Sequence, residues 1–483
     1  MIQYRFISFI LGIFLSILAG AMVIPALMDL LHGDPDWVYF AEAAAITGFV
    51  GVLLGLSCKP DAPPSLEIRE TFILTVSSWM MISAFASLPF ILSSVAPTMT
   101  DAFFEAVSGL TTTGATVFQD LDYAPPGILL WRALLQWLGG VGIVVMAMTI
   151  LPALKIGGMQ LFRNEFSDRS EKYLPRISQV ATAILSTYLL FSTLCSVAYW
   201  LAGMTPFEAI CIMMSTVSTA GFATSDLSIG SFNSPWIEAI AIVFMILGST
   251  TLLLCTRFLQ GDVKSLWKDP QVRVYLCLLL VASACLTGWL WQTQQYDGLT
   301  AFRQGVFAAV SIGSTTGFTI GDFSVWGGFS VIFLFLLMFI GGCTGSTAGG
   351  IKIFRFQILF KAAQLQLRQL RRPHGIFIPL YNMQRLKESE FMSVLAFFAL
   401  YIFCYAALAL SLTLCDIDVL SSLSGSATIL GNVGPGLGDQ ISYHGNYSAL
   451  PDPAKWIVMF GMLLGRLELL TILIFFSPSF WRT

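Results

Sequence analysis

Long, almost uninterrupted runs of apolar residues dominate the pattern of the chain. Each run is near or above the roughly 20 residues that an α-helix needs to cross the hydrocarbon layer of a bilayer. We therefore predict about ten spanning helices, at residues 6–31, 38–57, 71–95, 127–153, 177–203, 235–256, 274–291, 325–343, 391–414 and 455–476. The predicted fold class is an all-α membrane protein, because a helix pairs its own backbone groups where lipid offers them no partners.

Four shorter apolar segments, each of about a dozen residues, lie between predicted spans on one side of the membrane. They cover 101–112, 205–217, 298–313 and 418–430, and they end in small, hydroxylated residues. They are too short to cross, so we predict half-helices that enter the membrane and return as extended loops. Two roles stay open for the acidic residues near these segments: capping the half-helices, as Asp101, Asp297 and Asp418 with Thr205 could do, or attracting cations.

A glycine follows each of these segments within a similar tetrapeptide. The four are Thr112-Thr113-Gly114-Ala115, Thr219-Ala220-Gly221-Phe222, Thr315-Thr316-Gly317-Phe318 and Asn432-Val433-Gly434-Pro435, whose glycines lie 96 to 117 residues apart. This spacing indicates one unit repeated four times. Because irregular backbone at membrane depth must face protein or a water-filled cavity, the loops should face one another around a central pore. A ring of their carbonyl oxygens could replace the water shell of a potassium ion, while close helix packing by small residues is the alternative.

Basic residues test this topology, because Lys and Arg gather in cytoplasmic loops. With a cytoplasmic N-terminus, all but four of the 25 Lys and Arg residues fall on the cytoplasmic side, and the C-terminus is cytoplasmic too. The exceptions are Arg132, Arg303, Lys455 and Arg466. Only 11% of residues are charged and 56% are hydrophobic, which excludes an ordinary soluble enzyme. The nine cysteines and three histidines form no pattern typical of a disulfide, metal or catalytic centre.

The predicted span at 325–343 runs into Gly341–Gly350, which holds five glycines. Each glycine inside a helix costs about 1 kcal/mol relative to alanine, so we predict an irregular loop that gates the pore, with helix packing as the alternative. The predicted gate residues are Gly345, Ser346, Thr347, Gly349 and Arg466. A deeply placed arginine is costly, so Arg466 should face the pore or bond the loop's carbonyls; a salt bridge to Glu468 or snorkelling is the alternative.

With these motifs the chain resembles the Trk/Ktr/HKT superfamily of potassium transport proteins, most closely its TrkH type. The resemblance implies four fused helix–pore loop–helix repeats, at 59–175, 176–270, 271–388 and 389–483, after an N-terminal two-helix hairpin at 1–58. It also implies one selectivity-filter glycine per repeat: Gly114, Gly221, Gly317 and Gly434. A glycine in all four repeats is the pattern associated with potassium selectivity. The fourth segment departs from the others in its Asn432-Val433 and Pro435, and Gly431 is an alternative filter glycine there.

The same resemblance implies potassium uptake across the bacterial inner membrane by a homodimer, without an organic cofactor. The implied partner is a cytosolic ring of nucleotide-binding TrkA-type subunits. It would dock on the basic segments Lys155–Arg176 and Lys352–Lys387, for which anionic lipid contact is the alternative. No nucleic-acid partner is expected. A proton- or sodium-coupled symporter is the alternative function, although Glu468 is the one carboxylate convincingly placed at mid-membrane for such coupling.

Overall fold

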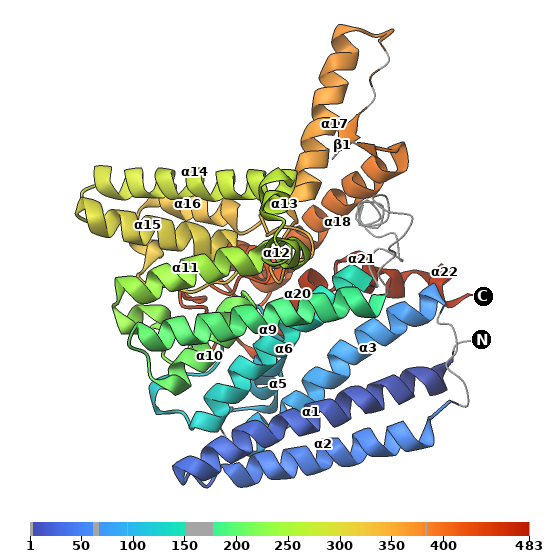
Figure 1. Ribbon diagram of the computed structural model, residues 1–483, viewed down its shortest axis with the longest axis vertical. Helices are drawn as coiled ribbons and strands as arrows, with labels where there is room; N and C mark the ends of the chain where they lie inside the picture. Colours follow the sequence, from blue (N-terminus) through green and yellow to red (C-terminus); the bar gives the residue numbers. More distant parts are fainter. Residues whose placement is uncertain are drawn as a thin grey trace.

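The computed structural model describes residues 3–482 apart from 61–66, 94, 150–176, 376, 378, 382 and 383. Within this part of the chain nearly all regular structure is helical (Figure 1). Strands β1 (Leu380–Tyr381) and β2 (Gln384–Arg385) form a small antiparallel hairpin. The predicted all-α fold is confirmed. The two ends of the chain lie on the same side of the molecule (Figure 1).

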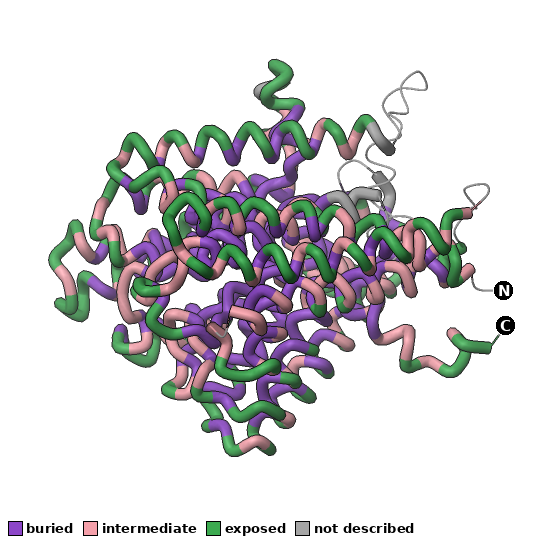
Figure 2. The backbone as a smooth tube through the Cα atoms, turned by 90° about the horizontal axis from the view of Figure 1, so that it is seen from below, coloured by how far each residue is buried: buried purple, intermediate pink, exposed green. Residues whose placement is uncertain are grey.

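Seven helices in the described residues are long and apolar enough to cross a membrane. They are α1 (Tyr4–His32), α2 (Trp37–Ser57), α3 (Ile68–Ala86) together with α4 (Leu88–Leu92), α6 (Pro126–Thr149), α9 (Ile177–Leu201), α14 (Pro270–Gln292) and α18 (Glu388–Thr413). Exposed positions lie along the outer helices, and buried positions fill the centre (Figure 2). Many of the exposed side chains are large and apolar, such as Leu31 and Leu56, as expected for surfaces that face lipid.

Two further spans are broken by sharp bends, which the sequence did not predict. Helices α11 (Pro235–Ser249) and α12 (Leu252–Leu259) meet at 105°, and α20 (Asp452–Arg466) meets α21 (Leu470–Leu473) and η4 (Ile474–Phe476) at 109°. Counting each bent pair as one span gives nine in the described residues. At the first bend, the Ser249 hydroxyl donates to the carbonyl of Met245, which is the kind of back-bonding that weakens a helix.

The span predicted at 325–343 forms only a short helix, α16 (Gly328–Leu337). After it the chain leaves helical geometry and continues through the glycine-rich loop Gly341–Gly350. Helix α17 (Ile353–Arg371) then projects away from the body of the molecule (Figure 1). Straight spanning helices are therefore fewer than the ten predicted, because one apolar run is interrupted by glycine and two others bend.

The four predicted half-helices are present as α5 (Met99–Leu110), α10 (Pro206–Val217), α15 (Gly298–Gly313) and α19 (Val419–Gly431). Thr205 and Asp418 cap α10 and α19 through their side chains, as predicted. Asp297 stands at the N-cap of α15 without a side-chain hydrogen bond. Asp101 does not take the capping role that was one of its two alternatives: Thr98 caps α5 by accepting from the Asp101 amide, and the Asp101 carboxylate pairs with Lys455.

The remaining described elements are short. They are η1 (Leu121–Tyr123), η2 (Ser228–Phe232), α13 (Val263–Lys268), η3 (Phe323–Val325) and α22 (Pro478–Trp481).

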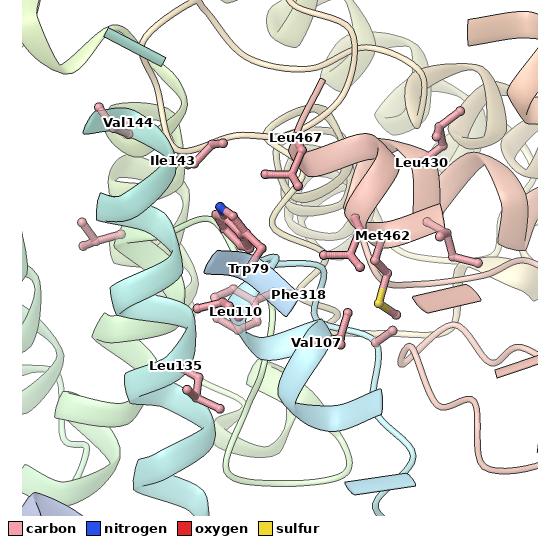
Figure 3. Packing of buried hydrophobic residues seen from close by; sticks show 14 of the residues in the cluster. Trp79, Val107, Leu110, Leu135, Ile143, Val144, Phe318, Leu430, Met462 and Leu467 are labelled. Carbon is pink, nitrogen blue, oxygen red and sulfur yellow. The ribbon is translucent and has the colours of Figure 1, made fainter. Parts of the chain in front are cut away.

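The half-helices lie inside the bundle, where they are packed on several sides. Figure 3 shows Val107 and Leu110 of α5 between Leu135 of α6 and Met462 of α20, and all four side chains belong to the buried core. Lipid tails are as apolar as leucine, so close packing holds such helices together more than the hydrophobic effect does. The half-helices are therefore fixed by the spans that surround them, and their C-terminal ends meet at the centre.

Candidate ion-conducting site

The four half-helices end with the same backbone turn. The residue two positions before each glycine has a left-handed conformation, with φ of 53° at Thr112, 52° at Thr219, 58° at Thr315 and 52° at Asn432. The next residue donates its N–H to the carbonyl five residues earlier, over 2.8 to 3.0 Å, in the pairs Thr113–Ser108, Ala220–Ser215, Thr316–Ser311 and Val433–Thr428. This hydrogen bond is typical of helix ends that close with a left-handed residue. The chain therefore builds one local structure four times.

The four glycines meet in a closed ring. All have positive φ, between 79° and 101°. A methyl group added to any of them would overlap a carbonyl oxygen of another repeat, in the pairs Gly114 with Ala220, Gly221 with Thr316, Gly317 with Val433 and Gly434 with Thr113. Each glycine thus abuts the residue that precedes the next glycine, and the fourth contact returns to the first repeat. The four segments surround one axis, and no side chain larger than hydrogen fits at these glycines.

Three of the left-handed residues are threonines, for which this conformation is unfavourable. A β-branched residue with positive φ is a genuine outlier, and such strain costs on the order of 1–3 kcal/mol per residue. Backbone strain of this kind persists only where the surroundings enforce it, and it gathers at functional sites. Asparagine tolerates the conformation better, so Asn432 takes it at lower cost.

The fourth segment follows the same path despite its different sequence. Gly434 has φ of 101° and occupies the ring position, whereas Gly431 is the last residue of α19. The Asn432 side-chain amide donates to the Thr113 hydroxyl over 2.9 Å and to the Met462 carbonyl over 3.0 Å. The bond to Thr113 ties the fourth segment to the first, and the bond to Met462 ties it to α20. Gly434, rather than Gly431, is therefore equivalent to the other three glycines.

Above the ring lies a cavity of about 270 Å³. Gly114 and Gly221 form part of its wall, together with polar residues that include Asp120, Asp226 and His444. Burial raises the pKa of Asp226, a hydrogen bond from the Leu121 amide opposes the shift, and the charge of Asp122 adds to it. The cavity combines the two carboxylates of Asp120 and Asp226 with access to the glycines, so it can collect cations at the mouth of the ring.

On the other side of the ring, the loop Gly341–Gly350 contacts the left-handed residues directly. The Gly349 amide donates to the Thr315 hydroxyl over 2.7 Å, and the hydroxyls of Thr347 and Thr219 lie 3.0 Å apart. A methyl group on Gly349 would overlap the Gly431 carbonyl oxygen. The loop is therefore packed against the inner end of the ring.

The bend between α11 and α12 holds this loop. The Cys343 amide donates to the Ser249 carbonyl over 2.9 Å, and the Thr347 amide donates to Gly248 over 3.1 Å. In return, the Leu252 amide donates to the Gly345 carbonyl over 3.1 Å. Bend and loop satisfy each other's backbone groups, as irregular backbone inside a membrane requires. The run Gly248-Ser249-Thr250-Thr251 is the feature of the sequence that could have indicated this bend.

Arg466 lies against the same loop. Its Nη1 donates to the Thr347 carbonyl over 2.9 Å, and its Nη2 is 3.5 Å from the Gly139 carbonyl. Glu468 forms its ion pair with Arg355 and not with Arg466. A small cavity of about 30 Å³ is lined by Gly345, Ser346, Gly349 and Arg466, among other residues. The structure thus brings the sequence-predicted gate residues together, although their role in gating stays a prediction.

Sequence reasoning missed three ion pairs that support the ring. They are Arg132–Glu105 at 2.7 Å, Arg303–Glu238 at 2.6 Å and Lys455–Asp101 at 2.6 Å. Their cations are three of the four basic residues that fell outside the cytoplasmic side in the sequence. An exception to the positive-inside tendency was therefore the available signal, because a basic residue that is buried within a membrane protein is paired.

Comparison with known proteins identifies the family of the chain. The TrkH family model, described as a cation transport protein, matches residues 39–483. A Trk system potassium uptake protein TrkI from Halomonas elongata is 42% identical over 474 residues, covering 98% of this chain and 96% of the relative. A Trk system potassium uptake protein TrkH from Salmonella typhimurium is 36% identical over 485 residues, covering 99% of this chain and all of the relative.

The fold is also known from a solved structure. The crystal structure of the potassium transporter TrkH from Vibrio parahaemolyticus superimposes with a TM-score of 0.92, at 36% identity and over 100% of both chains. Family and fold agree with the membrane spans, so the chain is an integral membrane protein and a transporter rather than an enzyme. It belongs to the TrkH family of cation transport proteins.

Proposed function

We propose that this chain takes up potassium ions across the bacterial inner membrane through a single pore at the centre of its four repeats. The observation that carries the proposal is the closed ring of four glycines and neighbouring carbonyl oxygens. The relatives named as potassium uptake proteins, at up to 42% identity, support potassium as the ion.

The ring supplies the chemistry that a dehydrated potassium ion needs. Carbonyl oxygens carry partial negative charge and can replace the water shell of the ion. The residues that would hold the ion are Thr112, Thr113, Gly114, Thr219, Ala220, Gly221, Thr315, Thr316, Gly317, Asn432, Val433 and Gly434. The four half-helices also direct the negative ends of their dipoles toward the ring, which favours a cation. Potassium is thus the cargo, and no organic cofactor is required.

The loop Gly341–Gly350 and Arg466 form the gate in this proposal. The support is that the loop contacts Thr219 and Thr315 at the inner end of the ring, while Arg466 bonds the loop through the Thr347 carbonyl. An ion leaving the ring inward would meet this loop. Opening therefore requires the loop to give up its bonds to the ring.

Control of the gate would come from a cytosolic TrkA-type nucleotide-binding subunit, on a homodimer of this chain. One basic segment that would receive it is Lys155–Arg176, which lies outside the described residues. The other is Lys352–Lys387, which includes the projecting helix α17. The same proposal includes cytoplasmic N- and C-termini. It also includes the repeat boundaries 59–175, 176–270, 271–388 and 389–483.

A proton- or sodium-coupled symporter is the alternative. Its carrier would be a carboxylate that is free to change its charge or ligand within the membrane. Glu468, the candidate from sequence, is bound to Arg355, which favours a pore over coupled transport.

Uptake of radioactive rubidium by liposomes that contain the purified chain tests the proposal, with sodium and lithium as competitors. We expect rubidium uptake that excess sodium leaves largely unchanged. Gly114→Ser should abolish this preference, because a side chain there would overlap the Ala220 carbonyl oxygen. Uptake that requires a proton or sodium gradient would favour the symporter, and uptake insensitive to Gly114→Ser would refute the assignment of the ring.

A further inference from the structure

Helix α6 presents two buried polar side chains on one face. Arg132 and Gln136 are one helical turn apart, and their exposed fractions are 1% and 0%. Residues four apart lie side by side on a helix, so both side chains point in one direction. Although α6 belongs to the first repeat, this face is turned toward the ring segment of the second repeat. Arg132 Nη1 donates to the Ala223 carbonyl over 3.1 Å.

Gln136 binds the backbone on both sides of Gly221. Its Nε2 donates to the Ala220 carbonyl over 3.0 Å, and its Oε1 accepts from the Phe222 amide over 3.2 Å. The side-chain amide of Gln136 can both donate and accept hydrogen bonds, and here its nitrogen donates and its oxygen accepts. One side chain therefore fixes the two peptide groups that flank the ring glycine.

Peptide planarity gives the second of these bonds a consequence for the ion path. In a trans peptide the N–H and C=O groups point in opposite directions. The Phe222 N–H and the Gly221 carbonyl belong to one peptide group, so an N–H held by Gln136 directs the Gly221 oxygen to the opposite side. Without the acceptor, this peptide group could rotate and take its oxygen out of the ring, because glycine permits both orientations.

The hydrogen bond from Gln136 to Ala220 makes the ring asymmetric, because the four repeats no longer have equivalent carbonyl oxygens. Ala220 contributes the oxygen that abuts Gly114. Among the described residues, we find no side-chain donor on the corresponding oxygens of Thr113, Thr316 and Val433. An N–H donor on one oxygen competes with an ion for the electrons of that oxygen. Gln136 therefore controls the geometry and the partial charge of the ring segment of the second repeat.

The fourth repeat cannot use the same device. Pro435 stands where Phe222 stands in the second repeat, and proline has no backbone N–H to be held. There the Tyr447 hydroxyl donates to the Gly434 carbonyl over 2.9 Å. Different side chains thus hold the ring segments of the second and fourth repeats, and a change at Gln136 should act through the second repeat.

We propose that Gln136 is a positioning residue that determines ion selectivity, by fixing the carbonyl groups of Ala220 and Gly221. The inference rests on the proposed potassium-conducting function. Gln136 need not touch the ion, because it acts through the backbone of the second repeat.

The test is the ratio of rubidium to sodium uptake by liposomes that contain the purified chain. Gln136→Leu removes both hydrogen bonds at similar volume, and we expect the ratio to fall about tenfold, which is the typical effect of one buried hydrogen bond. Gln136→Glu retains an acceptor for the Phe222 amide and should give an intermediate ratio. The matched control is Trp137→Phe, which removes a 2.9 Å hydrogen bond from Trp137 to Ser192 at the next position of the same helix. Its ratio should equal that of the wild type.

A Gln136→Leu ratio equal to that of the wild type and Trp137→Phe would overturn the inference while leaving the proposed function intact. A wild-type chain that does not prefer rubidium over sodium would instead refute the proposed function. If Gln136→Leu conducts no ion, thermal unfolding of the purified variant in potassium or sodium replaces the flux measurement. If potassium stabilises the variant more than sodium does, as in the wild type, the inference is overturned. If the variant has lost this difference, the inference is supported.

Discussion

At the scale of single residues, the four ring glycines could be predicted from the sequence, but their left-handed neighbours could not. Glycine at a repeated spacing is informative because it permits positive φ and close approach of backbone. Threonine rarely adopts positive φ, so the sequence did not indicate the left-handed conformation of Thr112, Thr219 and Thr315. Gln136 was missed because nothing in the sequence placed α6 against the second repeat.

Substitutions of the ring glycines should differ in severity. A methyl group on Gly317 would overlap the Val433 carbonyl oxygen and crowd Pro435, whereas one on Gly434 would stand 2.7 Å from the nearest atom, the Thr113 oxygen. We therefore expect Gly317→Ala to lower rubidium uptake more than Gly434→Ala does, while the positive φ disfavours alanine at both positions. Uptake into cells that lack other potassium transporters measures this, normalised to the amount of protein in the membrane. The reverse order of severity would contradict the ring geometry.

His444 predicts how uptake depends on external pH. Burial lowers the pKa of His444 below its ordinary value of 6.5, and the charge of Asp322 opposes the shift. The side chain is therefore neutral at pH 7, where it bonds the Thr319 hydroxyl over 2.9 Å, and gains a positive charge only in more acidic solution. It lines the cavity above the ring, so this charge should repel cations there.

We expect rubidium uptake to be constant from about pH 7 to 8 and to fall only in solution more acidic than the ordinary histidine pKa of 6.5. His444→Gln should keep uptake at pH 5.5 close to its value at pH 7. The stability effect has the same sign, because the unfolded chain takes up this proton first as the pH falls through about 6.5. An equal decline in wild type and variant would show that another group is responsible.

At the scale of elements, the glycine-rich loop Gly341–Gly350 was predicted from the sequence, but the bend between α11 and α12 that binds it was not. Five glycines within Gly341–Gly350 predict a broken helix from local propensity alone. The bends after α11 and α20 depend on tertiary contacts: the first is held by hydrogen bonds to the loop, and the second leaves Glu468 with φ of 59° beside its partner Arg355. An apolar run that is long enough to span the membrane has the same sequence pattern whether its helix is straight or bent.

Weakening the hold on the loop should raise basal flux. Arg466→Gln shortens the side chain and removes its charge and its 2.9 Å bond to the Thr347 carbonyl. Loss of a charged hydrogen bond of about 1.5–3 kcal/mol would shift a closed–open equilibrium by roughly tenfold or more. Rubidium uptake by the purified chain without any cytosolic partner measures the effect. Unchanged or lower flux would argue against Arg466 as part of the gate.

At the scale of the whole molecule, the family, the all-α fold and the convergence of four repeats were accessible from the sequence, because repeated spacing constrains how the repeats assemble. The bonds between repeats were not accessible. Lys455 of α20 reaches Asp101 of α5 across 354 positions of sequence, and Arg132 of α6 reaches the second repeat. Such contacts depend on the final packing, which local patterns do not encode.

The Lys455–Asp101 pair should hold the last repeat to the first. Its two side chains have exposed fractions of 8% and 4%, so removal of the cation leaves an unpaired buried carboxylate. We expect Lys455→Met to lower the free energy of unfolding by about 3–5 kcal/mol. Thermal unfolding in detergent measures the change, with the exposed Lys264→Met as the control. Asp101→Asn added to Lys455→Met should recover part of the lost stability. If Lys455→Met alone causes no loss, the pair does not hold the last repeat to the first.

Anomalous X-ray scattering from crystals grown in rubidium locates the ion directly. We expect a rubidium peak on the axis of the ring, among the carbonyl oxygens of Thr113, Ala220, Thr316 and Val433 and those of the four glycines. An empty ring, with rubidium bound elsewhere within the membrane region, would contradict the proposed ion site.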